Sequence, residues 1–223
     1  MSTLTHDPAP ADAAQTVAVN RFRQRFCGYS LITAAVLIVA AEATTPETGN
    51  ENTTAELVRV FADNPTQTQV SAVLLHFGAL LVLPGIVGLL GLTRLRAVRL
   101  AHVGAFLAFL GFASLAGNVV VDFFHLSAGL ELTPAEATRY MDATEALPGA
   151  AAFIVPAFLG SFVGLLLLFI AIGRAGELAW HWVALVAVGL ALIVLAPSQA
   201  AMVAGFVAVA GGLAAAGARL LRG

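Results

Sequence analysis

The chain has 223 residues, of which 59% are hydrophobic and 11% are charged, with a formal net charge of -2 and a mean hydropathy of +0.90. Soluble domains carry about 25% charged residues, so the composition excludes an ordinary soluble protein and predicts an integral membrane protein. The net charge says nothing about nucleic acid, and because there is no basic patch beyond short loop clusters, no nucleic-acid partner is expected. The one cysteine, Cys27, excludes a disulfide framework and a thiolate metal site within the chain.

Six apolar runs are long enough, or nearly so, to cross a hydrocarbon core of about 30 Å, which takes about 20 helical residues. The predicted fold is therefore an all-α integral membrane protein with six transmembrane helices. These cover residues 26–43, 70–92, 100–124, 149–173, 178–196 and 199–218. Pro197 separates the last two, because proline lacks an N–H donor and disfavours helix at the residue before it.

The remaining segments are polar. We expect a disordered cytoplasmic leader at 1–25, outer segments at 44–69 and 126–148 that are long enough to act as lids, and a cytoplasmic tail at 219–223. The first span also resembles a signal peptide with a cleavage site in "AEA" at 41–43. The long polar leader and the acidic residue in that tripeptide favour an uncleaved anchor.

The arginines predict the orientation. All of them except Arg59 and Arg139 fall on one side of the six predicted spans, and the chain contains no lysine. Because basic loops are retained in the cytoplasm, both termini are predicted to be cytoplasmic. The use of arginine in place of lysine, with many Ala and Gly residues, indicates a GC-rich bacterium, so the expected location is the bacterial cell membrane.

An offset of 80 residues reveals an internal repeat. It aligns Glu42 with Asp122, Glu56 with Glu136, Arg59 with Arg139, and Arg94 with Arg174. Spans 1 and 2 would then map onto spans 3 and 4 as a parallel repeat, with spans 5 and 6 as an added hairpin. In the second outer segment, Thr133, Pro134 and Glu136 predict a capped helix start.

The third span carries a stripe of polar side chains at helical spacing, formed by Ser114, Asn118, Asp122 and His125. Ionisable groups at this depth face protein or a water-filled cavity. The stripe and three groups from other spans predict an outward-opening polar pocket. Its expected members are Glu42, His76, Asn118, Asp122, His125 and Gln199.

Simpler interpretations remain open for each member. Asp122 can end its helix with His125 as an ion-pair partner. His76 can make an ordinary hydrogen bond between helices, and Glu42 can lie in water.

No cofactor or metal is expected. His102 and His125 lie about 35 Å apart on one helix, which does not suit a haem held by two histidines. His181 lies at the membrane edge between Trp180 and Trp182.

Zinc has little more support. His76, His125 and Asp122 could supply three zinc ligands, but the chain lacks an H-x-x-x-H pair.

The sixth span repeats small residues at Ala204, Ala208, Gly212 and Ala216, a spacing that permits close helix contact. This stripe predicts packing either inside the chain or in a homodimer.

A carboxyl group inside a membrane tends to keep its proton, because burial disfavours the charged form, and it can then act as a general acid. Aromatic faces such as those of Phe77, Phe123 and Phe124 can stabilise a developing cation. These groups suit proton-initiated cyclisation of an isoprenoid chain. They also suit a proton-coupled transporter or export component, and a non-catalytic accessory, sensor or assembly partner is a further alternative.

The stretches "HFGALLVLPGIVGLLGL" and "LPGAAAFIVPAFLGSFVGLLLL", each preceded by an acidic outer segment, resemble those of small six-helix, multi-pass membrane proteins of GC-rich bacteria. The chain length and the helix-end carboxylates are similar to those of the membrane-bound terpene cyclases of bacterial indole-terpenoid pathways. That resemblance implies catalysis by acidic residues near the membrane edge, which are Asp122 and Glu42 here. The expected substrate is a lipophilic small molecule, bound by His76, Asn118, His125, Gln199 and the three phenylalanines.

Overall fold

The computed structural model describes residues 10–47, 53–93, 97–195 and 198–222, with side chains from Val19 onward, and all regular structure within these ranges is helical. The first half of the chain forms α1 (Pro10–Thr44), α2 (Thr54–Asp63), α3 (Pro65–Leu92), α4 (Val98–Asn118) and α5 (Val120–Glu131). The second half forms α6 (Pro134–Glu145), α7 (Pro148–Val155), a π-helical turn η1 (Pro156–Gly160), α8 (Ser161–Ala175), α9 (Trp180–Leu195) and α10 (Gln199–Arg222).

Five helical segments among the described residues are long and apolar enough to cross a membrane, which is compatible with a multi-pass membrane protein. They are Val19–Thr44, Pro65–Leu92, Val98–Glu131, Pro148–Ala175 and Gln199–Arg222. The predicted fifth span forms α9, which has 16 residues. At 1.5 Å per residue it reaches about 24 Å, short of a hydrocarbon core of about 30 Å. By length, five candidate spans therefore lie in the described part of the chain, with α9 as a shorter apolar helix beside them.

Two predicted boundaries differ from the structure. Residues 10–25 were expected to be disordered, yet they are helical and continuous with the first span, because they contain many good helix formers. The third span was expected to end at 124, yet α5 continues the helix to Glu131. Val119 joins α4 to α5 in a helical backbone conformation, and its N–H donates to the carbonyl of Leu115.

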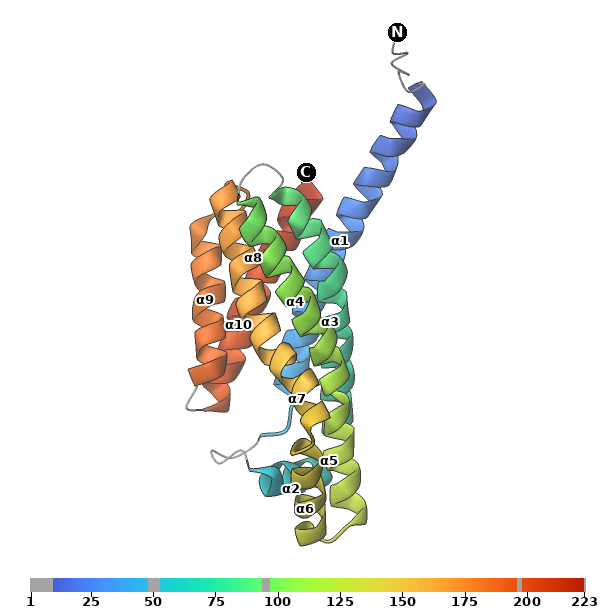
Figure 1. Cartoon of the computed structure of the whole chain (residues 1–223), viewed down its shortest axis with the longest axis vertical. Helices are drawn as coiled ribbons and strands as arrows, with labels where there is room; N and C mark the ends of the chain where they lie inside the picture. Colours follow the sequence, from blue (N-terminus) through green and yellow to red (C-terminus); the bar gives the residue numbers. More distant parts are fainter. Residues whose placement is uncertain (1–9, 48–52, 94–96, 196–197, 223) are drawn as a thin grey trace.

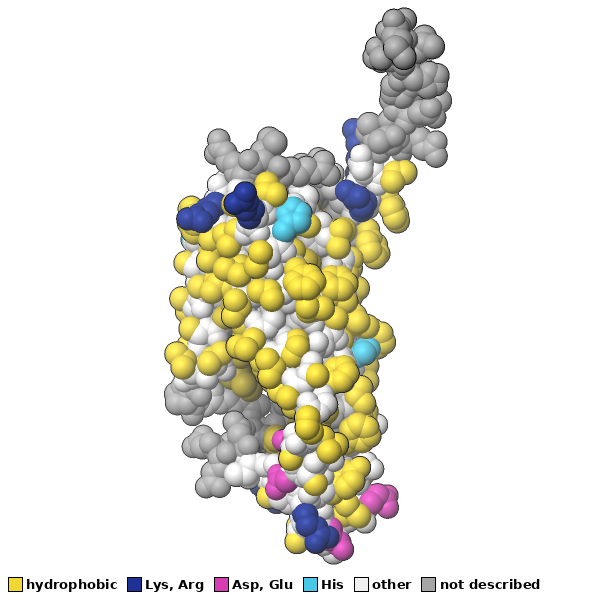
Figure 2. All heavy atoms as spheres, viewed as in Figure 1, with side chains coloured by type: hydrophobic (Ala, Val, Ile, Leu, Met, Phe, Trp, Pro, Cys, Tyr) yellow, Lys and Arg dark blue, Asp and Glu magenta, His cyan; other side chains and the backbone are white. Residues whose placement is uncertain are grey.

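Charged and hydrophobic side chains are separated along the bundle. Figure 2 shows hydrophobic side chains over most of the visible face between an end with Arg side chains and an end where Asp and Glu gather together with Arg. Figure 1 places the start of α1 and the end of α10 towards the first end and α2, α5 and α6 at the other, which we call the outer end. Large apolar side chains such as Phe106, Leu159 and Val188 are more than half exposed, as expected for a surface in contact with lipid.

Small residues bring the helices of the bundle together. α1 packs on α3 and α10, α4 packs on α8, and α9 packs on α10. A Cβ atom added at Gly111 of α4 would lie 1.9 Å from the backbone nitrogen of Ser161, and one at Gly164 would lie 2.1 Å from that of Ala108. The α4–α8 contact is therefore between backbones, with no room for a side chain at either glycine.

The fourth span is irregular where it meets α4. Pro156 has no N–H donor, so the regular α-helical hydrogen-bond pattern is interrupted there. The chain takes a π-helical turn over Pro156–Gly160 and returns to α-helix at Ser161, whose hydroxyl donates to the carbonyl of Ala157.

The predicted lid segments form a compact unit with α5. We call α2, α5 and α6 the outer cap. Apolar side chains from all three helices pack together, in two clusters formed by Val58, Ala128, Ala137 and Met141, and by Val60, Phe61 and Leu126. The predicted start of α6 is confirmed, because the Thr133 N–H and hydroxyl donate to the Glu136 carboxylate at 3.1 and 2.6 Å. On α2, Arg59 pairs with Asp63 at 3.4 Å.

The small residues of α10 are used inside the chain. Gly212 and Ala216 are buried, whereas Ala204 is exposed. A Cβ atom at Gly205 would lie 2.7 Å from the Gly189 carbonyl of α9, so these helices touch at their backbones. A homodimer through the same stripe stays a prediction.

Candidate functional site

Two carboxyl groups from separate helices lie near each other at the outer end of the bundle. Glu42 is in the last turn of α1 and is buried, with 7% of its surface exposed. Asp122 is in the first turn of α5 and is half-buried. Their charges are close enough to repel each other. The two groups therefore lie in one region of the bundle, and their chemical role stays a prediction.

Gln199 joins this region from the start of α10. Its side-chain Nε2 donates to the backbone carbonyl of Thr45, 3.3 Å away, just after the helix turn that carries Glu42. Its Oε1 atom is buried and finds no hydrogen-bond donor among the described residues. A buried amide oxygen without a donor costs free energy, so this atom is available to accept from a protonated acid or a bound molecule.

His76 holds α3 against α4. Its Nδ1 lies 2.8 Å from the carbonyl oxygen of Ala116, which requires the proton on Nδ1 because a carbonyl only accepts. The ring is half-buried and touches the edge of Phe77, with the centroids 5.2 Å apart. This geometry fits the simpler interpretation of His76 as a hydrogen bond between helices.

His125 does not join the carboxyl pair. Its Nδ1 lies 3.0 Å from the Val121 carbonyl, and its ring packs edge-on against Phe61 of the outer cap. Its Nε2 lies 3.4 Å from the Glu145 carboxylate of α6. This is within ion-pair range, but the nitrogen makes no hydrogen bond with any described residue. The expected pairing of His125 with Asp122 is therefore wrong, because α6 brings a different carboxylate.

The expected aromatic lining stays a prediction. Phe77 and Phe124 are 53% and 51% exposed and face outwards. Phe124 is two residues beyond Asp122, which places it on nearly the opposite side of the helix. Phe123, Ser114 and Asn118 are half-buried.

Sequence reasoning missed an apolar cavity of about 40 Å³ between the helices. It is lined by Ile38, Leu75, Phe112, Leu115, Ser161, Phe162, Leu165, Leu190, Ile193, Phe206, Val209 and Leu213. Ile38 lies one turn from Glu42 on the same face of α1, and Leu115 lies two turns from Asp122. Since residues from six helices meet here, no local pattern in the sequence could have identified the cavity.

The described residues contain no group of three His, Cys, Asp or Glu side chains that could hold a metal ion. In particular, His125 and Asp122 have different neighbours, so the three zinc ligands considered from the sequence do not form a set.

A comparison with protein families, curated proteins and solved structures finds no match to this chain. The site therefore has to be interpreted from its own geometry.

Proposed function

We propose that the protein is a membrane-embedded terpene cyclase that protonates a lipophilic isoprenoid or meroterpenoid substrate with the Glu42–Asp122 pair. The observation that carries the proposal is the approach of these two carboxyl groups near the outer side of an apolar cavity. Two neighbouring carboxylates in a site of low polarity repel each other, so a proton on one of them lowers the free energy of the pair.

The chemistry needs no cofactor. The carboxylic acid adds its proton to a substrate double bond, which forms a C–H bond and leaves a carbocation. A second double bond attacks the cation to close the ring, and loss of a proton to the carboxylate restores the acid. Phe112 and Phe206 line the cavity, and their π-electrons would stabilise the cation.

The cavity limits how a substrate enters. Its volume of about 40 Å³ accommodates about one water-sized group. A prenyl chain therefore enters when the helices separate, and it enters laterally from the bilayer in the orientation that we propose.

The test is turnover of prenylated substrates by membranes that contain the protein, with the products separated by mass spectrometry. We expect Asp122→Asn and Glu42→Gln each to reduce turnover at least about 100-fold, the usual contribution of a general acid. Glu131→Gln is the matched control, because Glu131 is an exposed carboxylate on the same helix as Asp122.

Unchanged turnover in both variants removes the pair from the acid role. If the wild type shows no turnover, the cyclase proposal is wrong for the substrates tested. The non-catalytic alternative then replaces it.

Proton-coupled transport is the second candidate, supported by the irregular backbone near the centre of the bundle. The π-helical turn η1 packs against α4, and the turn at Val119 lies on the outer side of that contact. Interrupted helices commonly border ion and substrate paths in transporters. In proteoliposomes with a pH-sensitive dye, transport predicts substrate-driven proton flux that Asp122→Asn abolishes, whereas the cyclase predicts product without flux.

We also propose the orientation and the repeat. Arg99, Arg174 and Arg219 lie at the ends of helices that share one end of the bundle, which supports cytoplasmic termini in a bacterial cell membrane. The pairing of α1 with α3 and of α4 with α8 supports a parallel repeat. Arg94 lies outside the described residues, so its alignment with Arg174 rests on the sequence alone. Cysteine labelling at position 222 from each side of the membrane tests the orientation.

A further inference from the structure

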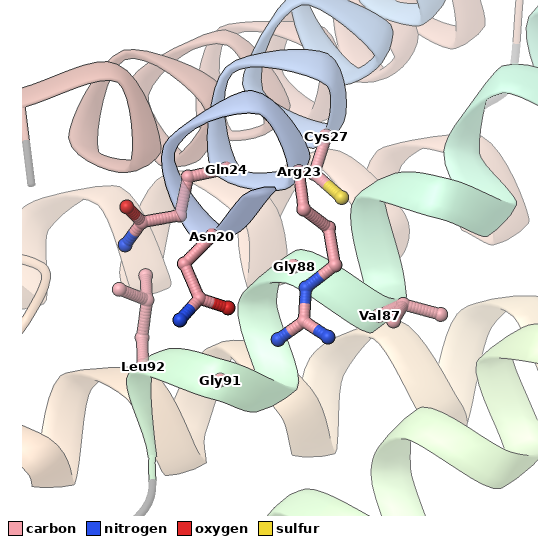
Figure 3. Close-up of a pocket in the computed structure, with 8 residues that line it drawn as sticks. All are labelled: Asn20, Arg23, Gln24, Cys27, Val87, Gly88, Gly91 and Leu92. Carbon is pink, nitrogen blue, oxygen red and sulfur yellow. The ribbon is translucent and has the colours of Figure 1, made fainter. Parts of the chain in front are cut away.

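A polar pocket lies at the end of the bundle opposite the carboxyl pair. It has a volume of about 300 Å³ and lies between the first turns of the α1 span and the last turns of α3. Figure 3 shows Asn20 and Arg23 reaching from α1 towards α3, with Cys27 deeper along the same helix. None of the site residues considered above belongs to this pocket.

Glycines on α3 shape the pocket. Gly88 lies against α1, where an added Cβ atom would be 2.5 Å from the Cβ of Cys27. One turn later, an added Cβ at Gly91 would meet nothing within 4 Å. The two helices are therefore in contact at Gly88 and leave open space at Gly91, and this space is the pocket.

The pocket carries positive charge and hydrogen-bond donors. Its lining includes the Arg23 guanidinium and the side-chain amides of Asn20 and Gln24, and it includes no Asp or Glu. Arg59 and Arg219 have carboxylate partners, whereas none of the described residues forms an ion pair with Arg23. A guanidinium binds phosphate through two parallel hydrogen bonds, and amide N–H groups can add to them.

The position of the pocket selects the source of the phosphate. Arg23 lies three residues before Phe26, where the first predicted span begins, which is the depth of lipid headgroups. Val87 lines the pocket and is 53% exposed, so the pocket has an apolar edge on the surface that acyl chains can contact.

We propose that this pocket binds the phosphate of an anionic phospholipid, with Arg23 as its main contact and Asn20 and Gln24 as hydrogen-bond donors. A volume of about 300 Å³ is at the lower end of ligand sites and suits a headgroup whose acyl chains remain in the bilayer beside Val87.

The test is native mass spectrometry of the full-length protein in a neutral detergent, titrated with phosphatidylglycerol or phosphatidylcholine. We expect the wild type to bind phosphatidylglycerol about tenfold more tightly than phosphatidylcholine, the difference expected for one charge-assisted contact. Arg23→Gln should lose this preference. Arg25→Gln, which removes an exposed charge from the same helix outside the pocket, should keep it.

A second variant tests the cavity without changing its charge. Gly91→Leu adds a side chain into the open space and should also abolish the preference for phosphatidylglycerol. Thermal unfolding in lipid-free detergent checks that Arg23→Gln and Gly91→Leu are folded. Equal losses in Arg23→Gln and Arg25→Gln would indicate general attraction to the basic end and would overturn the proposal. Binding of inorganic phosphate alone with the affinity of phosphatidylglycerol would overturn the assignment to a lipid.

Discussion

The membrane bundle and the outer cap are both made of helices, but different contacts hold them together. In the bundle, α4 and α8 meet at Gly111 and Gly164 through their backbones. In the outer cap, α2, α5 and α6 pack through apolar side chains such as Val58 and Met141, and the Thr133–Glu136 contact lies at the surface.

The surrounding solvent explains the difference. Lipid tails are as apolar as leucine, so membrane helices gain little from burying apolar side chains and depend on close packing. The α2 and α6 helices of the outer cap carry Arg59, Glu136 and other exposed polar groups, and these two helices gain by removing apolar surface from water. Four substitutions would separate these two modes of packing.

The largest effect is expected from Gly111→Ala. The new methyl group would overlap the Ser161 backbone, which cannot move away as a flexible side chain can, so the loss in unfolding free energy should exceed about 4 kcal/mol. Thermal unfolding in detergent, followed by size-exclusion chromatography, measures it. Gly117→Ala is the control, because a Cβ there meets nothing within 4 Å. Similar unfolding temperatures for the two variants would contradict backbone contact as the basis of the bundle.

Met141→Ala should have a smaller and local effect. Met141 is fully buried in the outer cap, and truncation of a buried methionine costs about 2–5 kcal/mol. We expect faster amide hydrogen exchange in α2 and α6 and no change in α8. Tyr140→Ala alters an exposed neighbour and should leave exchange unchanged. Faster exchange throughout the bundle would show that the cap and the bundle unfold as one unit.

Thr133→Ala should destabilise only the start of α6, by about 1 kcal/mol, as for the loss of an N-cap. The hydroxyl contact with Glu136 disappears in this variant. Hydrogen exchange of the first turn of α6 measures the change, and Thr144→Ala, near the other end of α6, is the control. If Thr133→Ala and Thr144→Ala change the exchange of this turn equally, the contact between Thr133 and Glu136 does not specifically stabilise the helix start.

The smallest effect is the pH dependence of the same helix start. Hydrogen bonds from the Thr133 side chain and backbone hold the pKa of Glu136 below its ordinary value of 4.5. A carboxyl group with a lowered pKa in the folded state stabilises that state above the unfolded pKa, and this stabilisation is lost as the pH falls through the folded value. Exchange of the first turn of α6 should therefore accelerate relative to Glu136→Gln as the pH falls below the ordinary value of 4.5. If the ratio of the exchange rates of the two proteins does not change with pH, protonation of Glu136 is not linked to the stability of this helix start.

Much of the helical architecture follows from local patterns. Apolar run length predicted an all-helical membrane protein, and five of the six predicted runs lie in described helices long enough to cross a membrane. Thr133, Pro134 and Glu136 identified the start of α6, because a capping box depends on neighbours three residues apart. The ends of α1 and α5 were less predictable, because a helix can extend into water where no residue stops it.

The candidate site could be predicted only in part. Glu42 and Asp122 stand out in the sequence because carboxylates are rare in apolar helices. The offset of 80 residues in the internal repeat aligns one with the other. Glu145 could not be identified as the neighbour of His125, because it reaches that position through the turn between α5 and α6 and the packing of the outer cap.

The sequence by itself determined that the chain is an apolar, helical protein with its arginines concentrated at one end, because hydrophobicity and charge act residue by residue. Only the tertiary structure decided which polar groups meet. It brought Glu42 near Asp122, turned His125 towards Glu145, and opened a pocket beside Arg23. These outcomes depend on how closely the helices approach one another. That distance is set by glycines that are far apart in the chain.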